Sequence, residues 1–580
     1  MSLTLQERIS RFEPATLGEN VSHLHADDRA ALVKLVEVCK YIDMLYYRQA
    51  WKGNEALRAQ LEAKANQSPE AADQLLCFEL NRGPWDRTTD HEPFIPGVPA
   101  KPPMGANFYP EDLTREEWDQ WLATLSPDEV AKAKGFYHIV TRGVLTDSLG
   151  SLVSDPNSQT TSGLRCVPYS EAYSDLLVPA AELLKSAGQL VQPRHPTLAR
   201  FLEQRAESFL TNDYLTSELA WLRVEASEEC PLEITCGPYE VYTDTFMSYK
   251  AAFEMYIHWR DAQESERLDT FKHTLPLIEQ RLPIPEVVKR KDLTPPPIVV
   301  VNELMHAGDV AVPMTAAYNL PNDEEAVRRG GSRLTIIKNV QEKKYEKVLL
   351  PIADLVVAED QVPHLSFGAF FTHVLLHEVA HSNGPQTVTE NLPEENSPSD
   401  GKGLLTRMWD AVWGSSPSPQ AAPTVRSRLQ ELYSTIEEAK ADITGLFAAA
   451  ELIDEGLIKD VTLESFYVTF LASAFRSIRF GLNEAHGRGQ AIQLNYLLDK
   501  QAFEVEEATG KFRVNFSKMR EAVRDLTHDL IMHQARGNKA NVDAFVKELG
   551  VLRPHTEKAL EKLAKVPVDI RPKFTLTEPL

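Results

Sequence analysis

The chain has 580 residues, of which 43% are hydrophobic and 25% are charged, and its formal net charge is −23. This composition is ordinary for a globular protein, but the length exceeds what one compact core usually holds, so we expect two or three packed lobes. Nucleic acid and membrane surfaces are disfavoured as partners, because both are anionic and the average field of the chain would repel them.

The N-terminus and the cysteines favour an intracellular location. The first residues, MSLTLQERISRFEP, lack the basic start and the apolar stretch of a secretory signal. No run of residues approaches the roughly 18 apolar residues of a membrane span. The five cysteines are an odd number and lack the paired spacings of a disulfide framework. We therefore expect a cytoplasmic protein.

The sequence before about residue 365 predicts both helices and strands. Residues 1–80 read as helices, because apolar side chains recur at helical spacing. Residues 90–109 contain five prolines, which predict an extended, irregular segment. Residues 295–305 and 332–340 are rich in β-branched side chains and are bounded by proline or glycine, which is typical of strands.

From about residue 365 the pattern is helical almost to the C-terminus. The three clearest helical segments are 366–381, 427–453 and 463–486. The first two are separated by stretches rich in Ser, Pro and Asn, 391–401 and 414–425, which predict a mobile insertion that carries no chemistry.

A pentapeptide in the first of these helices can bind a metal. His377, Glu378 and His381 form the sequence His-Glu-Val-Ala-His, which places the two imidazoles one turn apart on the same helix face. A catalytic zinc needs three protein ligands and an open position for water, and Glu378 can reach that water as a general base. We assign no role to His373, because a fourth protein ligand would close that position. Chance is the alternative, since the chain has 16 histidines.

An acidic cluster in the next helix supplies a second, independent signal. The segment 434–446, STIEEAKADITGL, carries Glu437, Glu438 and Asp442 on a helix that is otherwise apolar on one side. We expect Glu438 to be the third zinc ligand. Glu437 and Asp442 should lie behind the ligands, where Asp442 accepts a hydrogen bond from a ligand imidazole. The alternative is a solvated acidic face with an incidental Lys440.

Together the two motifs resemble the dipeptidyl peptidase III family of zinc peptidases, including its bacterial and plant branch that is often labelled as Nudix-associated. In that family the first motif commonly has one more residue before the second histidine, whereas this chain has five residues, as in a minority of relatives. The family's third zinc ligand falls on Glu438. The glycine-rich, glutamate-dense box of Nudix nucleotide hydrolases is absent from the sequence.

Three further stretches extend the resemblance. CGPYEVYTDTF resembles the segment whose tyrosine stabilises the oxyanion and whose glutamate holds the substrate amine, and these positions fall on Tyr242 and Glu240. YNLPNDEE resembles a segment that helps to hold the peptide N-terminus, through positions that fall on Asn319 and Asn322. FGLNEAHGRG resembles a helix with a histidine that assists the transition state, here His486.

These assignments have a chemical basis. A phenol such as that of Tyr242 or an imidazole such as that of His486 can stabilise the negative charge of a tetrahedral intermediate. Glu240, Asn319 and Asn322 offer one carboxylate and two amide carbonyls to an ammonium group. The alternatives are packed core residues for the first pair and ordinary turn chemistry for the asparagines.

The predicted fold is α+β, with two lobes separated by a wide cleft, one mostly helical and zinc-bearing and the other mixed with a β-barrel-like or sheet core. The expected segments are 1–255 (mixed lobe with a helical N-terminus), 256–294 (helical segment joining the zinc lobe), 295–362 (strand-rich segment of the mixed lobe), 363–535 (helical zinc-binding lobe) and 536–580 (C-terminal segment).

The resemblance implies a zinc-dependent exopeptidase with one Zn²⁺ per chain. It would release dipeptides from the free N-terminus of short peptides by attack of a water that Glu378 activates. A zinc aminopeptidase or another amide hydrolase with the same metal site, or a catalytically weak peptide-binding protein, is the alternative. We expect neither nucleic acid nor membrane as a partner, and the sequence leaves the oligomeric state open.

Overall fold

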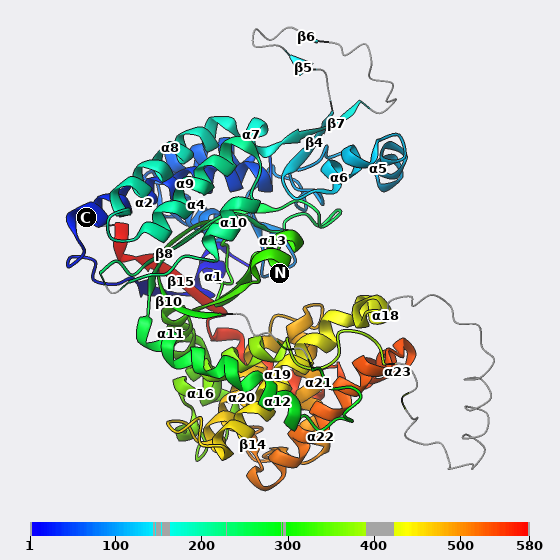
Figure 1. The fold of residues 1–580 in the computed structure, drawn as a ribbon. Helices are drawn as coiled ribbons and strands as arrows, with labels where there is room; N and C mark the ends of the chain where they lie inside the picture. Colours follow the sequence, from blue (N-terminus) through cyan, green and yellow to red (C-terminus); the bar gives the residue numbers. More distant parts are fainter. Residues whose placement is uncertain are drawn as a thin grey trace, which may run out of the picture. The chain divides into compact units, whose positions relative to one another are not determined.

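The computed structural model describes residues 3–142, 145–146, 152–153, 163–227, 229–291, 293, 297–389, 392 and 423–577. The chain forms two compact units (Figure 1). The first unit is made of Met1–Asp269, Pro296–Val348 and Pro567–Leu580, and the second of Thr270–Pro295 and Leu349–Val566. Apart from residues 392 and 423–425, the predicted insertion lies outside the described residues.

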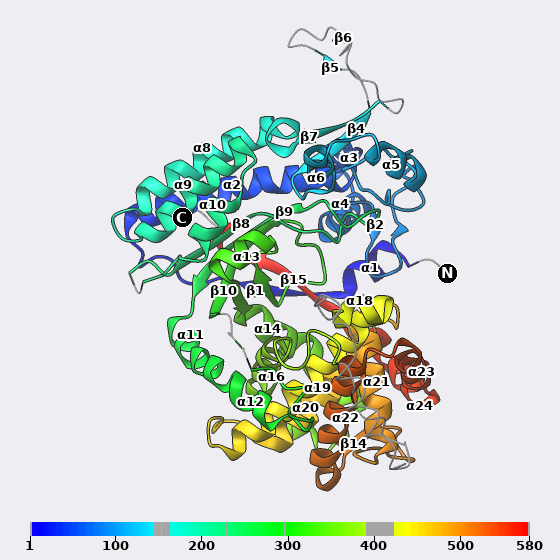
Figure 2. The same ribbon diagram turned by 45° about the vertical axis from the view of Figure 1, so that its right-hand side comes forward.

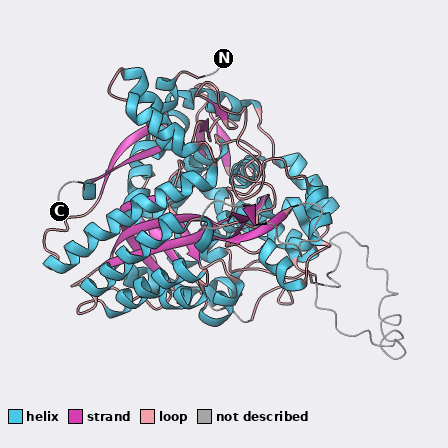
Figure 3. Cartoon of the chain, turned by 90° about the horizontal axis from the view of Figure 1, so that it is seen from above, coloured by secondary structure: helices cyan, strands magenta, loops and turns pink. Residues whose placement is uncertain are grey.

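The first unit is built around a five-stranded mixed sheet. Its strands, in spatial order, are β11 (Ala317–Leu320), β12 (Arg333–Ile337), β10 (Ile298–Gly308), β9 (Ala252–Arg260) and β8 (Leu232–Glu240). β10 and β12 run parallel, and the other neighbouring pairs are antiparallel. The long strands of the chain gather in this sheet (magenta in Figure 3).

The ladder of this sheet is open, with β8 and β11 at its two edges. Side chains nevertheless join the edges, because Thr235 Oγ1 of β8 lies 2.7 Å from Tyr318 Oη of β11. Of the two predicted cores, the structure therefore has the sheet, strongly curved, and its described strands do not close into a barrel ladder. The predicted α+β fold is confirmed.

Helices cover the sheet and form the core of the first unit with it. α2 (Ala26–Ala50), α8 (Ser174–Val191) and α9 (Pro196–Thr211) lie alongside one another, and α2 also packs on β9 and β10 (Figures 1 and 2). On α2 the fully buried side chains include Leu32, Leu35 and Cys39, whose helical spacing produces the apolar face. β9 is buried along seven of its nine residues, as expected for a strand inside a covered sheet.

Shorter elements surround this core. The other helices of the first unit are α1 (Leu5–Ser10), α3 (Asn54–Lys64), α4 (Pro69–Asn81), α5 (Arg115–Leu122), α6 (Pro127–Lys134), α7 (Tyr169–Ala172), α10 (Leu215–Trp221), α11 (Ala262–Asp269), α13 (Glu324–Gly330) and α14 (Lys338–Lys344). The paired strands outside the main sheet are β2 (Trp85–Asp86) with β3 (Glu92–Pro93), β4 (His138–Arg142) with β7 (Leu164–Pro168), β5 (Leu145–Thr146) with β6 (Leu152–Val153), and β1 (Phe12–Leu17) with β15 (Asp569–Phe574).

The second unit is mostly helical. Its helices are α12 (Leu275–Arg281), α15 (Leu350–Val356), α16 (Phe367–Ala380), α18 (Val425–Leu429), α19 (Tyr433–Asp454), α20 (Leu463–Ile478), α21 (Ala485–Asp499), α22 (Phe516–Arg536), α23 (Lys539–Leu549) and α24 (Pro554–Lys562). A short hairpin of β13 (Phe503–Val505) and β14 (Phe512–Val514) accompanies them.

Helix α19 is the centre of this unit. It packs against α16, α20, α21 and α22, and it is buried around most of its circumference. Two glycines allow the closest approaches: a Cβ on Gly445 would lie 3.0 Å from the backbone nitrogen of His377 in α16, and a Cβ on Gly489 of α21 would lie 3.2 Å from that of Ala439. Any polar side chain on so enclosed a helix needs a partner inside the protein.

The two units divide the chain at different residues from the expected segments. Residues 256–260, placed in a helical segment, are the end of β9, and α11 belongs to the first unit. The helix α15, placed in the strand-rich segment, belongs to the second unit, and the C-terminal segment is shared between the units. One difference has a clear cause, because the chain passes from the first unit to the second after Val348, inside the π-helix Tyr345–Leu349, where no linker composition marks a boundary.

Two further observations bear on the setting of the protein. All five cysteines are free thiols, and four of them are buried. Among the helices of the described ranges, none combines the length and the apolar character that a bilayer crossing requires.

Candidate metal centre

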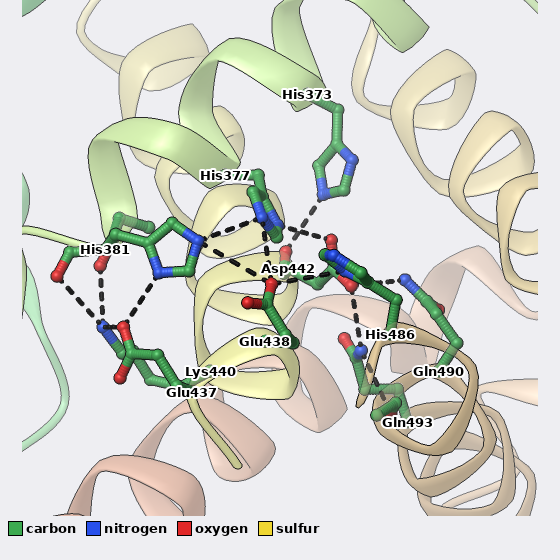
Figure 4. Close-up of polar contacts among 12 residues, drawn as sticks. His373, His377, His381, Glu437, Glu438, Lys440, Asp442, His486, Gln490 and Gln493 are labelled. Atoms are coloured by element: carbon green, nitrogen blue, oxygen red, sulfur yellow. Dashed lines mark hydrogen bonds and ion pairs between the residues drawn. The ribbon is translucent and has the colours of Figure 1, made fainter. Parts of the chain in front are cut away.

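Two histidines from the end of α16 and one glutamate of α19 converge in the second unit (Figure 4). Nε2 of His377 lies 3.2 Å from Nε2 of His381. Oε2 of Glu438 lies 3.3 Å from the first of these nitrogens and 3.7 Å from the second. Ligand atoms that share one tetrahedral ion at about 2.0–2.2 Å are about 3.3–3.6 Å apart, so the three atoms have the spacing of a single small cation site.

Each imidazole is held by a carboxylate on its far side. Nδ1 of His377 lies 2.7 Å from Asp442 Oδ1, and Nδ1 of His381 lies 2.9 Å from Glu437 Oε1. An ionised carboxylate only accepts hydrogen bonds, so each Nδ1 carries the proton and each Nε2 presents its lone pair to the site. Both tautomers are thus fixed in the form that binds a metal.

The donor atoms fit a cation better than they fit one another. The two Nε2 lone pairs face each other, and neither can donate a hydrogen bond while its Nδ1 holds the proton. Glu438 Oε2 is buried and has no hydrogen-bond partner within the described ranges. A positive ion bound by all three atoms would satisfy them together, whereas unmatched buried acceptors are costly.

The charges around the site keep the carboxylates ionised. Burial opposes ionisation of Asp442, but His377 outweighs it and lowers the pKa of Asp442 below its usual range. Burial likewise opposes ionisation of Glu437, yet Lys440 and His381 lower the pKa of Glu437 to about 2. The shell outside the ligands therefore carries negative charge, which favours a cation.

Lys440 is part of this arrangement rather than of a solvated face. Its side chain is 1% exposed, and Nζ lies 2.8 Å from Glu437 Oε1. The same ammonium donates to the carbonyl of Ala380, at 2.9 Å, and to that of Asn383, at 3.1 Å. The alternative of an incidental surface lysine is thus wrong for this helix, because Lys440 neutralises Glu437 and caps the end of α16.

His486 lies at the same centre, and Glu378 follows one of its ligands in the chain. Nδ1 of His486, at the start of α21, is 3.2 Å from Glu438 Oε2, and His377, Glu438 and His486 offer ligand atoms that all lie within 4.8 Å of one another. The His486 side chain is 59% exposed, so it can reach a bound molecule. Glu378 follows the first ligand in α16 and is half-buried.

Sequence reasoning assigned no role to His373 and missed two glutamines of the centre. His373 is buried, and its Nε2 lies 3.0 Å from the backbone oxygen of Asp442. Gln490 donates to Asp442 and Gln534 donates to Glu437, each at 2.7 Å, whereas Gln493 makes its better hydrogen bond to the backbone oxygen of Gly489. The one available signal was spacing, because residue 490 follows His486 at i+4 on one helix face. Nothing in the sequence marked Gln534.

The residues expected to hold a peptide N-terminus lie in the first unit. Asn322 donates from Nδ2 to the backbone oxygen of Tyr239, at 3.0 Å, and to Glu240 Oε1, at 3.4 Å. Burial raises the pKa of Glu240, although Asn322 opposes the shift. Tyr242 is 80% exposed on the turn after β8, and Asn319 is exposed on β11. The structure thus brings Glu240 and Asn322 into contact.

Comparisons with known proteins cover almost the whole chain. No family model matches the sequence. The Arabidopsis thaliana protein named Nudix hydrolase 3 is 38% identical over 611 aligned positions, which include 100% of this chain and 75% of the plant protein. The solved structure of DPP III from Caldithrix abyssi matches with a TM-score of 0.86 and 34% identity over 98% of this chain and 99% of that one. Dipeptidyl-peptidase III from Corallococcus sp. strain EGB matches with a TM-score of 0.78 and 40% identity over 98% and 96% of the two chains.

Proposed function

This chain belongs to the dipeptidyl peptidase III family, and from that premise we propose that it is a zinc-dependent exopeptidase that releases dipeptides from the free N-terminus of short peptides. The solved relatives that support a peptidase are similar over nearly their whole length, so the proposal does not rest on one shared motif. The substrate class, the metal and the length of the released product are the parts that experiment has to test.

One observation carries the proposal. Nε2 of His377, Nε2 of His381 and Oε2 of Glu438 lie 3.2–3.7 Å apart, with both imidazoles oriented by carboxylates. Two histidines and one glutamate are a known ligand set of catalytic zinc in peptidases, and three protein ligands leave one position open. The chemistry of the donors therefore favours Zn²⁺ over Mg²⁺ or Ca²⁺, which prefer oxygen ligands.

Zn²⁺ bound by these residues would supply Lewis acidity, which polarises a peptide carbonyl and makes water a stronger acid. Glu378 would take a proton from the attacking water and deliver it to the departing amine. Its place next to His377 suits this role, because a general base must lie within hydrogen-bond reach of the water. His486 and Tyr242 would donate hydrogen bonds to the negative oxygen that develops during attack.

The first unit would recognise the end of the peptide. Glu240 is held by Asn322 and lies where burial raises the pKa of its carboxyl group. A carboxylate in such surroundings gains from contact with an ammonium group, and the amide oxygens of Asn322 and Asn319 can accept its remaining hydrogens. Recognition of the amine would fix which peptide bond is cleaved.

The test uses a short unblocked peptide beside its N-acetylated twin, each incubated with and without a chelator. We expect the unblocked peptide to lose a dipeptide, the acetylated twin to resist, and the chelator to stop the reaction until Zn²⁺ is restored. Product masses decide between the proposal and its alternatives. Release of single residues would indicate an aminopeptidase, cleavage of the acetylated twin a different amide hydrolase, and binding without turnover a peptide-binding protein.

The name of the plant relative is said of that protein, and we do not propose nucleotide hydrolysis for this chain. A quarter of that protein lies outside the part that this chain matches. Incubation with nucleoside diphosphate derivatives provides the matching control, and we expect no turnover of them.

A further inference from the structure

Two buried glutamines lie behind the proposed metal ligands. We infer that Gln490 of α21 and Gln534 of α22 are positioning residues that fix the two carboxylates on which the ligand imidazoles depend. This inference rests on the metal site of the proposed function. It concerns neither a ligand nor a group that touches substrate, but the layer of side chains outside both.

The first glutamine forms a relay to His377. Gln490 donates from Nε2 to Asp442 Oδ2 at 2.7 Å, while Oδ1 of the same carboxylate lies 2.7 Å from Nδ1 of His377. Both oxygens of Asp442 are thus engaged in short hydrogen bonds on opposite sides, as Figure 4 shows. Rotation of the carboxylate would break one of them, so the glutamine sets the plane in which Asp442 meets the imidazole.

The second glutamine forms the corresponding relay to His381. Gln534 donates from Nε2 to Glu437 Oε2 at 2.7 Å, and Oε1 of that carboxylate lies 2.9 Å from Nδ1 of His381. Each ligand histidine is therefore hydrogen-bonded to a carboxylate, and that carboxylate is hydrogen-bonded to a glutamine amide. The two amides come from different helices. Gln490 is 3% exposed and Gln534 is 1% exposed, so both amides lie inside the protein.

The hydrogen bonds of the two glutamine amides indicate a positioning role. Oε1 of Gln490 and Oε1 of Gln534 are buried and lack a hydrogen-bond partner among the described residues. In the described part of the chain Oε1 of Gln493 is unmatched as well, but only Gln490 and Gln534 make a short bond from the NH₂ group to a carboxylate. A side chain that served only to fill space would be apolar at such a position, because an unmatched buried acceptor is unfavourable.

The relays differ in charge. Glu437 has the ammonium of Lys440 at 2.8 Å, whereas no Lys or Arg of the described ranges forms an ion pair with Asp442. When its glutamine is removed, Glu437 keeps the ammonium of Lys440, while Oδ2 of Asp442 keeps only the longer contact from Gln493 Nε2, at 3.5 Å. Gln490 should therefore matter more for metal binding than Gln534.

The experiment measures Zn²⁺ affinity by competition with a chromophoric chelator, using the full-length chain and the variants Gln490→Met, Gln534→Met and Gln493→Met. Methionine keeps the length of glutamine and removes the donor. Gln493 is the matched control, because it is equally buried and on the same helix, but its better hydrogen bond goes to the backbone oxygen of Gly489, at 3.2 Å. Thermal unfolding of the metal-free proteins checks that each variant folds.

We expect Gln490→Met to weaken Zn²⁺ binding about 10- to 100-fold, as substitutions in the shell outside metal ligands do. Gln534→Met should show a smaller loss, and Gln493→Met an affinity close to that of the unsubstituted chain. An unsubstituted chain that binds no Zn²⁺ would refute the proposed function itself. Tight binding by that chain and equal binding by Gln490→Met would overturn only the present inference, as would an equal loss in Gln493→Met. If Gln490→Met does not fold, an unchanged affinity in Gln534→Met overturns it.

Discussion

Lys440, near the middle of α19, donates a hydrogen bond from its buried ammonium to the carbonyl oxygen of Ala380, the last residue of α16, at 2.9 Å. The same group contacts Glu437, the carboxylate that orients His381. One side chain thus connects the end of the helix that carries both histidines with the carboxylate behind one of them. The position of His381 depends on this connection, because it follows Ala380 at the point where α16 ends.

The first prediction concerns this lysine. Lys440→Met leaves Glu437 buried without its ammonium and the end of α16 without its cap, so we expect the free energy of unfolding to fall by about 3 kcal/mol. Urea unfolding of the metal-free protein measures the change. Lys547→Met is the control, because that lysine is 75% exposed and pairs with Asp543 on the helix surface, where a loss of about 0.5 kcal/mol or less is typical. Equal effects in the two variants would contradict the assigned role.

The second prediction separates metal binding from proton transfer. Glu378→Gln keeps the size of the side chain and removes its basicity, so we expect kcat to fall by about 10²- to 10⁴-fold while one Zn²⁺ per chain is retained. Peptide turnover gives the rate, and metal analysis of the purified variant gives the content. Full activity in this variant would rule out Glu378 as the general base.

The third prediction tests recognition of the substrate amine. Glu240→Gln removes the charge that would pair with an ammonium, and we expect kcat/KM for an unblocked tetrapeptide to fall about 10- to 100-fold, mainly through KM. Glu182→Gln changes the net charge equally at an exposed position of α8 and should leave kcat/KM unaltered. If both variants behave like the unsubstituted chain, Glu240 does not hold the amine.

The fourth prediction concerns pH and the first unit. Burial, with a contribution from Arg333, lowers the pKa of His258 from 6.5 to about 3. In the unfolded chain this histidine becomes protonated near pH 6.5, whereas in the folded chain it becomes protonated only near pH 3. The free energy of unfolding therefore falls as the pH is lowered from 6.5 to 3. Above pH 6.5 His258 is neutral in both the folded and the unfolded chain, so this destabilisation is absent there. The slope it adds is about 1.4 kcal/mol per pH unit.

His258→Phe should remove this slope and preserve the packing. The ring of His258 stacks on Tyr256, at 5.3 Å between centroids, and on Tyr318, at 6.2 Å, and its Nε2 has no hydrogen-bond partner within the described part of the chain. Phenylalanine can therefore occupy the same stack. Urea unfolding between pH 4 and pH 7 checks the prediction, and parallel curves for the two proteins would contradict it.

Much of the second unit could be predicted because its helices carry their own signals. The apolar periodicity of 366–381 and 427–453 placed both metal-binding motifs on helices, as the structure has them in α16 and α19. The resemblance to the dipeptidyl peptidase III family and the α+β class are confirmed. The helix assignments needed only local spacing, and the family came from the resemblance of its motifs to those of known peptidases.

The remainder depended on contacts that sequence spacing does not reveal. Gln534 meets Glu437 across 97 residues, and its helix carries no mark of a metal centre. The strand expected over 332–340 ends at Ile337, because Lys338 begins α14 and Asn339 is used to bond the backbone of Glu303. β1 was missed among the N-terminal helices, since its partner β15 lies at the other end of the chain.

The parallel pairing of β1 with β15 has a consequence for biosynthesis. Residues Phe12–Leu17 are translated long before Asp569–Phe574, on which they pair. A strand left without its neighbour is a site for unwanted association in a nascent polypeptide. Maturation of the first unit therefore cannot finish until Asp569–Phe574 have been made, although most of its residues are made earlier.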